Sequence, residues 1–168
     1  MNAHGKKAIF FDIDGTLIFG EDGPFKDDVE AMEEAAGKGH LLFLNTGRSF
    51  GNIPEIMFQF SFFKGIVAGG GAHVLLEDDK PGSYKTIYHQ WVPDDMLEKI
   101  FDWYGKRSFF CMLEAEGGCY NINSYSRLHT AKAPIIVNTI DEFKRKSAGD
   151  LISKLTDRKS TRLNSSHT

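Results

Sequence analysis

The chain has 168 residues, of which 41% are hydrophobic and 26% are charged, and its formal net charge is −3. This composition is typical of a globular protein and excludes a globally disordered chain or a coiled coil. The negative net charge offers no basic field for nucleic acid, and no apolar run is long enough to predict a membrane span. Two cysteines are too few for a disulfide framework, which indicates a reducing interior. Together these observations make a cytoplasmic soluble enzyme, or part of one, the default interpretation.

Short apolar runs predict three buried strands in the first part of the chain, at residues 8–11, 41–44 and 66–68. Each run is continuous rather than alternating, which is typical of strands buried on both faces of a parallel sheet. Residues 27–38 predict a helix between the first two strands, and residues 54–62 a shorter helix between the second and third. The resulting βαβαβ order predicts a doubly wound α/β unit.

The pattern changes after the glycines at residues 69–71, which we interpret as a turn. The following segments predict strands at 72–76 and 86–91, a helix at 93–106, a hairpin at 109–113 and 119–122, a strand at 135–137 and a final helix at 141–155. A composition shift near residues 77–90 indicates a domain boundary. We therefore predict a first domain at residues 1–80 and a mixed α+β domain at 81–156.

The end of the chain is polar and has no periodicity. Residues 157–167 read DRKSTRLNSSH, which matches one reading frame of a common sequencing adapter residue for residue. We therefore predict that residues 157–168 are an artefact tail and exclude them from fold reasoning. On this interpretation the genuine sequence continues beyond Thr156 in a longer protein, whereas the alternative is an ordinary disordered terminus.

Two carboxylates directly follow the first predicted strand. Asp12 and Asp14 are two residues apart, so both point to the same side of an extended chain, and Gly15 permits a sharp turn after them. One carboxylate can attack an electrophilic centre while the other exchanges protons. Because two anions this close repel, the pair calls for a cation between or beside them.

Three residues that suit an oxyanion follow the second predicted strand. Thr46 offers a hydroxyl, Gly47 a backbone amide and Arg48 a guanidinium, which together suit a tetrahedral anion such as phosphate. Ligand sites in open parallel sheets lie at the carboxyl ends of the strands. We therefore expect a nucleophile and a phosphate cradle at neighbouring strand ends.

These motifs carry a family resemblance. AIFFDIDGTL (residues 8–17) and LLFLNTGR (residues 41–48) resemble the first and second motifs of the haloacid dehalogenase (HAD) superfamily. The order through GIVAGGGAHV (residues 65–74) is similar to the Cof-type phosphatases, which carry a large α/β cap after the third core strand. The resemblance covers residues 8 to about 125. It implies a partial Rossmann-like HAD core with a parallel sheet and an incomplete α+β cap domain.

The resemblance also implies roles for individual residues. Asp12 would form an aspartyl-phosphate, and Asp14 would act as the general acid and base. The Asp12 carboxylate and the Asp14 backbone carbonyl would bind Mg²⁺, while Thr46 and the Gly47 amide would hold the phosphoryl group. Arg48 follows the family's Thr-Gly-Arg pattern. The implied function is a Mg²⁺-dependent phosphatase that acts on a small phosphorylated metabolite.

The sequence departs from the family pattern in several places. A lysine in a third motif and a Gly-Asp-rich fourth motif, which supplies a further Mg²⁺ carboxylate, cannot be placed before Thr156. The usual Asn-Gly-Ala near the third strand reads Gly70-Gly71-Ala72. Losing such groups costs about 10²- to 10³-fold in rate, so we expect the chain itself to be nearly inactive. The fourth and fifth core strands of the family would be missing as well, so we expect the strand before Asp12 to lie at an exposed sheet edge, which is an aggregation risk.

Two other functions remain open at this stage. A phosphomutase or phosphotransferase would use another acceptor in place of water, and a non-catalytic protein would bind phosphate compounds or a partner without turnover. A calcium loop of the EF-hand kind does not fit, because its sixth and twelfth positions are Leu17 and Gly23. We expect His73 and His89 to serve packing rather than metal binding. The sequence leaves the oligomeric state undetermined.

Overall fold

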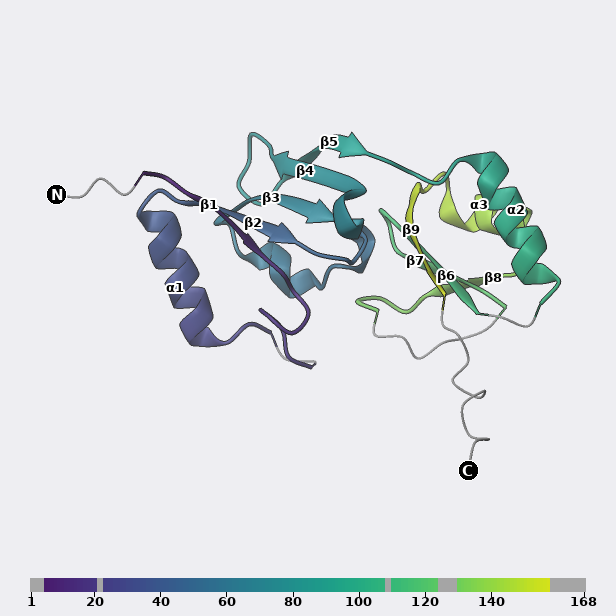
Figure 1. Cartoon of the computed structure of the whole chain (residues 1–168), viewed down its shortest axis with the longest axis horizontal. Helices are drawn as coiled ribbons and strands as arrows, with labels where there is room; N and C mark the ends of the chain where they lie inside the picture. The colour runs from purple at the N-terminus through teal and green to yellow at the C-terminus, as the bar shows by residue number, and fades with distance from the viewer. Residues whose placement is uncertain (1–4, 21–22, 108–109, 124–129, 158–168) are drawn as a thin grey trace, which may run out of the picture. The chain divides into compact units, whose positions relative to one another are not determined.

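The structure is a computed structural model of the chain, and it describes residues 5–20, 23–107, 110–123 and 130–157. The chain forms two compact units, each built around its own sheet (Figure 1). The first unit comprises Met1–Ser49 and Ile53–Gln90, and the second comprises Phe50–Asn52 and Trp91–Thr168. Apart from Asp157, the predicted artefact tail lies outside the described residues.

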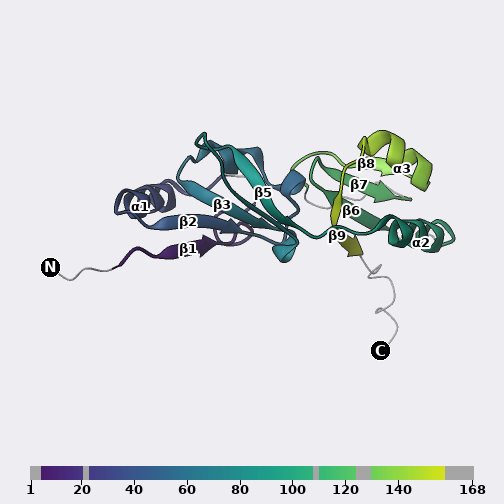
Figure 2. The ribbon, with the colours of Figure 1, turned by 90° about the horizontal axis from the view of Figure 1, so that it is seen from above.

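The first unit contains a five-stranded sheet in the order β1-β2-β3-β4-β5. Its strands are β1 (Ala8–Phe11), β2 (Leu41–Asn45), β3 (Phe63–Ala68), β4 (His73–Glu77) and β5 (Tyr84–His89). The first three strands are parallel, and β4 and β5 continue the sheet in antiparallel pairing. Figure 2 shows β1 and β5 as the two outermost strands. The predicted α/β core with a parallel sheet is therefore confirmed.

The connections in the first unit differ in length and in helix type. Helix α1 (Lys26–Gly37) joins β1 to β2 and buries Met32, close to its predicted bounds. The predicted helix at residues 54–62 is wrong, because only a short 3₁₀ helix forms at Glu55–Gln59. Since β3 begins at Phe63, earlier than predicted, too few residues remain to propagate an α-helix after Pro54.

The second unit is a mixed α+β structure around a four-stranded sheet in the order β8-β7-β6-β9. Its strands are β6 (Cys111–Ala115), β7 (Cys119–Ile122), β8 (Ile135–Val137) and β9 (Ile152–Asp157), and its helices are α2 (Asp94–Gly105) and α3 (Ile140–Ser147). Leu97 and Phe101 of α2 and Phe143 of α3 belong to one core cluster with sheet residues such as Leu113 and Ile122. Both helices therefore cover the same face of this sheet.

The predicted final helix at residues 141–155 is wrong in its second half. Thr139 caps the start of α3, where its Oγ1 accepts a hydrogen bond from the Glu142 N–H at 3.1 Å. The helix ends at Ser147 because Ala148 and Gly149 take left-handed backbone angles, with φ of 51° and 94°. The chain after this stop forms β9, which pairs antiparallel with β6.

The division between the units falls after Gln90, whereas the sequence interpretation placed a domain boundary at residue 80. Strand β5 pairs with β4 up to the pair His73 and His89, and this pairing keeps residues 84–89 with the first unit. None of the helices that the structure describes is both long enough and apolar enough to cross a membrane.

Two histidines stack on one another at one end of the paired strands β4 and β5. His73 is fully buried, its Nε2 lies 2.8 Å from Thr86 Oγ1, and its ring stacks on His89 with centroids 4.0 Å apart. The predicted packing role of these histidines is therefore confirmed. Burial, together with the neighbouring His89, lowers the pKa of His73 to about 4.

We predict that His73 makes the fold acid-sensitive. Between pH 6.5 and about 4 the unfolded chain binds a proton at His73 and the folded chain does not, so the free energy of unfolding falls as the pH falls through this window. The substitution His73→Gln should remove this part of the pH dependence in urea unfolding. Ile66→Val is the control, because it lowers the free energy of unfolding without removing a titratable group. In this variant the free energy of unfolding should change with pH as steeply as it does in the wild type. The same pH dependence of the free energy of unfolding in the wild type and in His73→Gln would contradict the prediction.

Candidate active site

The turn after β1 places two carboxylates on one side of the chain. Ile13 is fully buried between Asp12 and Asp14, which are both exposed, so the predicted same-side arrangement is present. The Ile13 carbonyl accepts hydrogen bonds from Leu17 N–H at 3.0 Å and Ile18 N–H at 2.9 Å. Gly15 has a φ of 74°, which a residue with a side chain rarely adopts. Asp12 Oδ1 accepts a hydrogen bond from Ile13 N–H at 2.8 Å, which orients the carboxylate.

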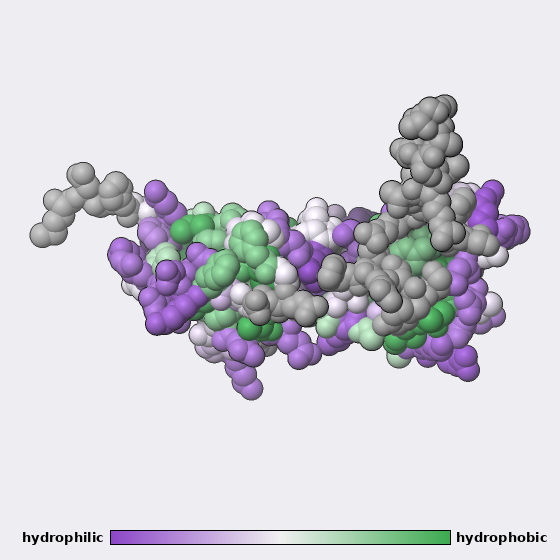
Figure 3. Space-filling model, turned by 90° about the horizontal axis from the view of Figure 1, so that it is seen from below, coloured by the Kyte–Doolittle hydropathy of each residue, from purple (hydrophilic) through white to green (hydrophobic). Residues whose placement is uncertain are grey.

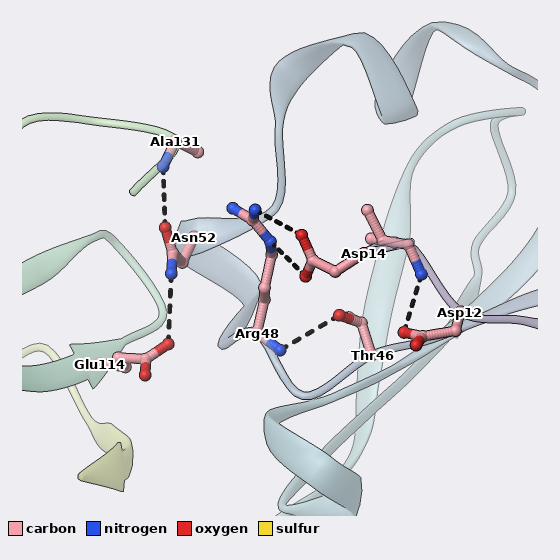
Figure 4. A network of polar contacts seen from close by, with 8 residues as sticks. Asp12, Asp14, Thr46, Arg48, Asn52, Glu114 and Ala131 are labelled. Carbon is pink, nitrogen blue, oxygen red and sulfur yellow. Dashed lines mark hydrogen bonds and ion pairs between the residues drawn. The ribbon is translucent and has the colours of Figure 1, made fainter. Parts of the chain in front are cut away.

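The loop after β2 is held by its own hydroxyl. Thr46 is 2% exposed, and its Oγ1 accepts a hydrogen bond from Arg48 N–H at 3.1 Å (Figure 4). The Thr46 N–H donates to the Val67 carbonyl at 2.8 Å, which ties the loop to β3. The hydroxyl therefore shapes the loop around Gly47.

The glycine triplet after β3 supports the same loop. Gly69 N–H donates to the Arg48 carbonyl at 2.6 Å, and Gly70 N–H donates to the Thr46 carbonyl at 3.1 Å. All three glycines have positive φ values, 61°, 66° and 100° in chain order. The sequence predicted a turn at this triplet and missed its contacts with the Thr46–Arg48 loop, because these depend on the pairing of β2 with β3.

A bidentate ion pair joins the two strand ends. Arg48 Nε donates to Asp14 Oδ2 at 2.8 Å, and Arg48 Nη2 donates to Asp14 Oδ1 at 2.7 Å (Figure 4). The Arg48 side chain is 16% exposed and the Asp14 side chain 55%. Guanidinium and carboxylate match well in this geometry. Arg48 therefore supplies a cation beside the carboxylate pair, whereas the sequence had placed it with the phosphate-binding residues.

The carboxylates offer part of a metal site. In the described ranges no group of three or more His, Cys, Asp or Glu side chains is arranged to hold a metal ion. Asp12 is exposed, and its carboxylate is the type of oxygen ligand that Mg²⁺ prefers. The Asp14 carboxylate is bound to Arg48, which is compatible with a metal contact through the Asp14 backbone carbonyl instead. The residues present thus fit the Mg²⁺ that the resemblance implies.

A buried polar network in the second unit was missed at the sequence level. Glu114 is 2% exposed, and its carboxylate accepts hydrogen bonds from Thr156 Oγ1 at 2.6 Å and Asn52 Nδ2 at 3.3 Å. Lys154 Nζ lies 3.2 Å from the same carboxylate. Asn52 Oδ1 also accepts a hydrogen bond from Ala131 N–H at 2.8 Å (Figure 4). The sequence hint for this network was a single acidic residue within the otherwise apolar segment of β6. The network could not be predicted from it, because the residues that bind the carboxylate come from distant segments of the chain.

A family model for haloacid dehalogenase-like hydrolases matches residues 9–166. The chain belongs to this family. The match includes both strand ends described above. It also runs into the predicted artefact tail, and the prediction for that tail stays untested. No curated protein matches the chain.

Solved structures of the family are similar to this chain. A HAD subclass IIB sugar phosphatase is 23% identical, with a TM-score of 0.65, and the match covers 90% of this chain and 58% of that one. A HAD/Cof-like hydrolase from Plasmodium vivax is 18% identical, with a TM-score of 0.69 and coverages of 92% and 57%. A HAD phosphatase from Bacteroides thetaiotaomicron is 20% identical, with a TM-score of 0.65 and coverages of 86% and 54%. The chain thus spans less than two thirds of the length of these relatives. At identities of 18–23%, the similarity establishes the fold alone.

We predict that the glycine turn after β3 requires glycine for its backbone angle. Gly70 has a φ of 66°, and a Cβ built on it meets no atom within 4 Å, so Gly70→Ala tests the angle without a clash. The substitution should lower the free energy of unfolding by about 1–2 kcal/mol, measured by urea denaturation. Gly105→Ala is the matched control, because its Cβ also meets nothing and its φ is ordinary. A Gly70→Ala variant as stable as Gly105→Ala would contradict the prediction.

Proposed function

We propose that this chain carries the nucleophile half of a Mg²⁺-dependent phosphatase site, which hydrolyses small phosphorylated metabolites through an aspartyl-phosphate. The observation that carries the proposal is the bidentate contact between Asp14 and Arg48. This contact joins Asp14, which follows β1, to the loop that follows β2 and contains Thr46. Family membership supports hydrolase chemistry at these two strand ends.

In the first step an Asp12 oxygen attacks phosphorus. A bond forms between Asp12 and the phosphoryl group while the bond to the leaving alcohol breaks, and Asp14 in its acid form donates a proton to the leaving oxygen. The hydrogen bond from Ile13 N–H to Asp12 Oδ1 holds the nucleophile in one orientation. Such preorganisation lowers the entropic part of the barrier.

In the second step water releases the phosphate. Asp14, now ionised, takes a proton from water, the water oxygen attacks phosphorus, and the bond to Asp12 breaks. The structure shows Asp14 as an acceptor of two Arg48 hydrogen bonds, which is the arrangement that suits its ionised form. Arg48 thus acts as a positioning residue for the base.

The loop between β2 and the 3₁₀ helix at Phe50–Asn52 would bind the transferred group. In this proposal the Gly47 amide donates to a phosphoryl oxygen, and the Thr46 hydroxyl, which accepts from Arg48 N–H, keeps its own proton to donate. Bound Mg²⁺, held by the Asp12 carboxylate and the Asp14 carbonyl, would neutralise charge on the phosphoryl group.

Cys111 and Cys119 form no disulfide, which supports a cytoplasmic setting.

The substrate class rests on the relatives. One similar structure is a sugar phosphatase, which supports a small phosphorylated metabolite as the substrate here. The sequence motifs place two of the carboxylates that the site requires, and no motif in the chain places the expected lysine or the further metal ligand. We therefore expect slow turnover by this chain, and the test needs a readout besides turnover.

We predict that Asp12 forms an adduct with trifluoroberyllate in the presence of Mg²⁺, because this anion mimics a phosphoryl group on a carboxylate. The adduct should appear by ¹⁹F NMR in the wild type and be absent in Asp12→Asn. Asp27→Asn is the matched control, because Asp27 lies in the first turn of α1 and outside the site. Any hydrolysis of p-nitrophenyl phosphate should fall at least about 10³-fold in Asp12→Asn.

The same assay separates the other candidate functions. Transfer of phosphate to an added alcohol or sugar in place of water would favour a phosphotransferase or phosphomutase. Adduct formation that survives Asp12→Asn would overturn the nucleophile assignment. Phosphate binding without an adduct and without hydrolysis would favour a non-catalytic binding protein.

A further inference from the structure

The segment Phe50–Asn52 belongs to the second unit, although the chain before it and after it belongs to the first. The segment forms a short 3₁₀ helix and begins two residues after Arg48, whose guanidinium binds Asp14. The glycine turn after β3 holds the Arg48 loop by backbone hydrogen bonds. On its C-terminal side the loop continues directly into Phe50–Asn52, so the second unit has a covalent route to the conformation of Arg48.

Gly51 packs closely against the turn between β6 and β7. A Cβ built on Gly51 would lie 2.5 Å from the Glu116 carbonyl oxygen and 2.8 Å from that of Ala115. It would also meet the Gly118 nitrogen, and all three atoms belong to the backbone, so no flexible side chain could move aside. Only glycine therefore allows the segment to approach this turn so closely.

The Asn52 side chain is hydrogen-bonded at both ends of its amide. Its Nδ2 donates to Glu114 Oε2 at 3.3 Å, and its Oδ1 accepts from Ala131 N–H at 2.8 Å (Figure 4). Asn52 is 4% exposed and Glu114 is 2% exposed. Because a buried polar group that loses its partner carries the full cost of desolvation, these contacts strongly favour one position of the segment.

The Glu114 carboxylate is itself held by β9. Its Oε1 accepts a hydrogen bond from Thr156 Oγ1 and lies near Lys154 Nζ, whereas its Oε2 binds Asn52. Contacts on both oxygens fix the direction of the carboxylate. Hydrogen bonds are directional, unlike the contacts open to the hydrophobic side chains that reach the surface in the space-filling view (Figure 3). The network can therefore set the orientation of the segment as well as its position.

Little slack separates this segment from Arg48. Three peptide bonds join Arg48 to Gly51, and even an extended chain spans at most about 3.6 Å per residue. Ser49, which lies between them, is fully buried, and this burial limits how far it can adjust. A displacement of Gly51 therefore reaches the backbone of Arg48.

We propose that Phe50–Asn52 is an anchor through which the second unit holds Arg48 in its contact with Asp14, with Asn52 and Glu114 as positioning residues for that contact. The catalytic consequence rests on the proposed function, in which Arg48 orients the base. The ion pair itself forms without substrate, so its readouts require no turnover. An absent trifluoroberyllate adduct would overturn the phosphatase proposal and would leave these readouts unchanged.

The Arg48 Nε–H reports on the ion pair directly, because it donates to Asp14 Oδ2 at 2.8 Å. In ¹⁵N NMR of the full chain, this proton should exchange with water at least about tenfold faster in Gly51→Ala than in the wild type, because the substitution forces the segment away from the β6–β7 turn. Gly105→Ala is the matched control, because its Cβ meets no atom within 4 Å, and it should exchange as the wild type does. Equal exchange in Gly51→Ala and the wild type would overturn the proposal.

A polarity exchange tests the contact between Asn52 and Glu114. Asn52→Asp sets a second carboxylate against Glu114, so it should raise the exchange rate of the Arg48 Nε–H at least about tenfold. Adding Glu114→Gln should restore the wild-type rate, because the new amide can donate to the new carboxylate and keep its oxygen for Thr156 and Lys154. A single variant that exchanges like the wild type, or a double variant that exchanges as fast as the single one, would overturn the proposal.

A core substitution separates anchoring from general stability. Ile152→Val lowers the stability of the same unit through its apolar core, where Ile152 is 1% exposed. The exchange rate of the Arg48 Nε–H should stay at its wild-type value in this variant. Exchange as fast as in Gly51→Ala would show that loss of stability alone releases Arg48, and would overturn the proposal.

Discussion

The ion pair between Arg48 and Asp14 depends on the parallel pairing of β1 with β2. This pairing puts the carboxyl ends of both strands at the same edge of the sheet, where each strand ends in a short polar loop. The bidentate contact then compensates the charge of Asp14 and joins the loops to one another. The orientation of Asp12, one residue before the buried Ile13, follows from the same turn.

Support for this edge comes from the next strand along the sheet. The glycine turn after β3 donates two backbone hydrogen bonds to the Thr46–Arg48 loop. Left-handed backbone angles at Gly69–Gly71 make these donors converge on one loop. The site therefore relies on backbone geometry in β3 as much as on the side chains of β1 and β2. A substitution at Gly70 can disturb the site without touching any residue that would contact substrate.

The second unit combines an apolar core with a buried polar network. Apolar side chains of α2 and α3 cover one face of its sheet. On β6, the buried Glu114 carboxylate is compensated by Thr156, Lys154 and Asn52. Breaking such a network leaves an uncompensated buried charge, which is costly. The segment Phe50–Asn52, only two residues after Arg48, belongs to this unit.

Local sequence determined the strands of the parallel sheet, helix α1, and the turn that places Asp12 and Asp14 on one side. These features follow from continuous apolar runs and from residue alternation, which act over a few neighbouring residues. The motifs also indicated Thr46 and Gly47 as an anion-binding loop. Tertiary structure decided the rest. Arg48 pairs with Asp14 because β1 lies beside β2, residues 152–157 form a strand because β6 offers an edge, and Glu114 is buried because distant donors reach it. Hydrogen bonds between segments far apart in sequence leave no periodic pattern in the chain, so only the folded structure reveals them.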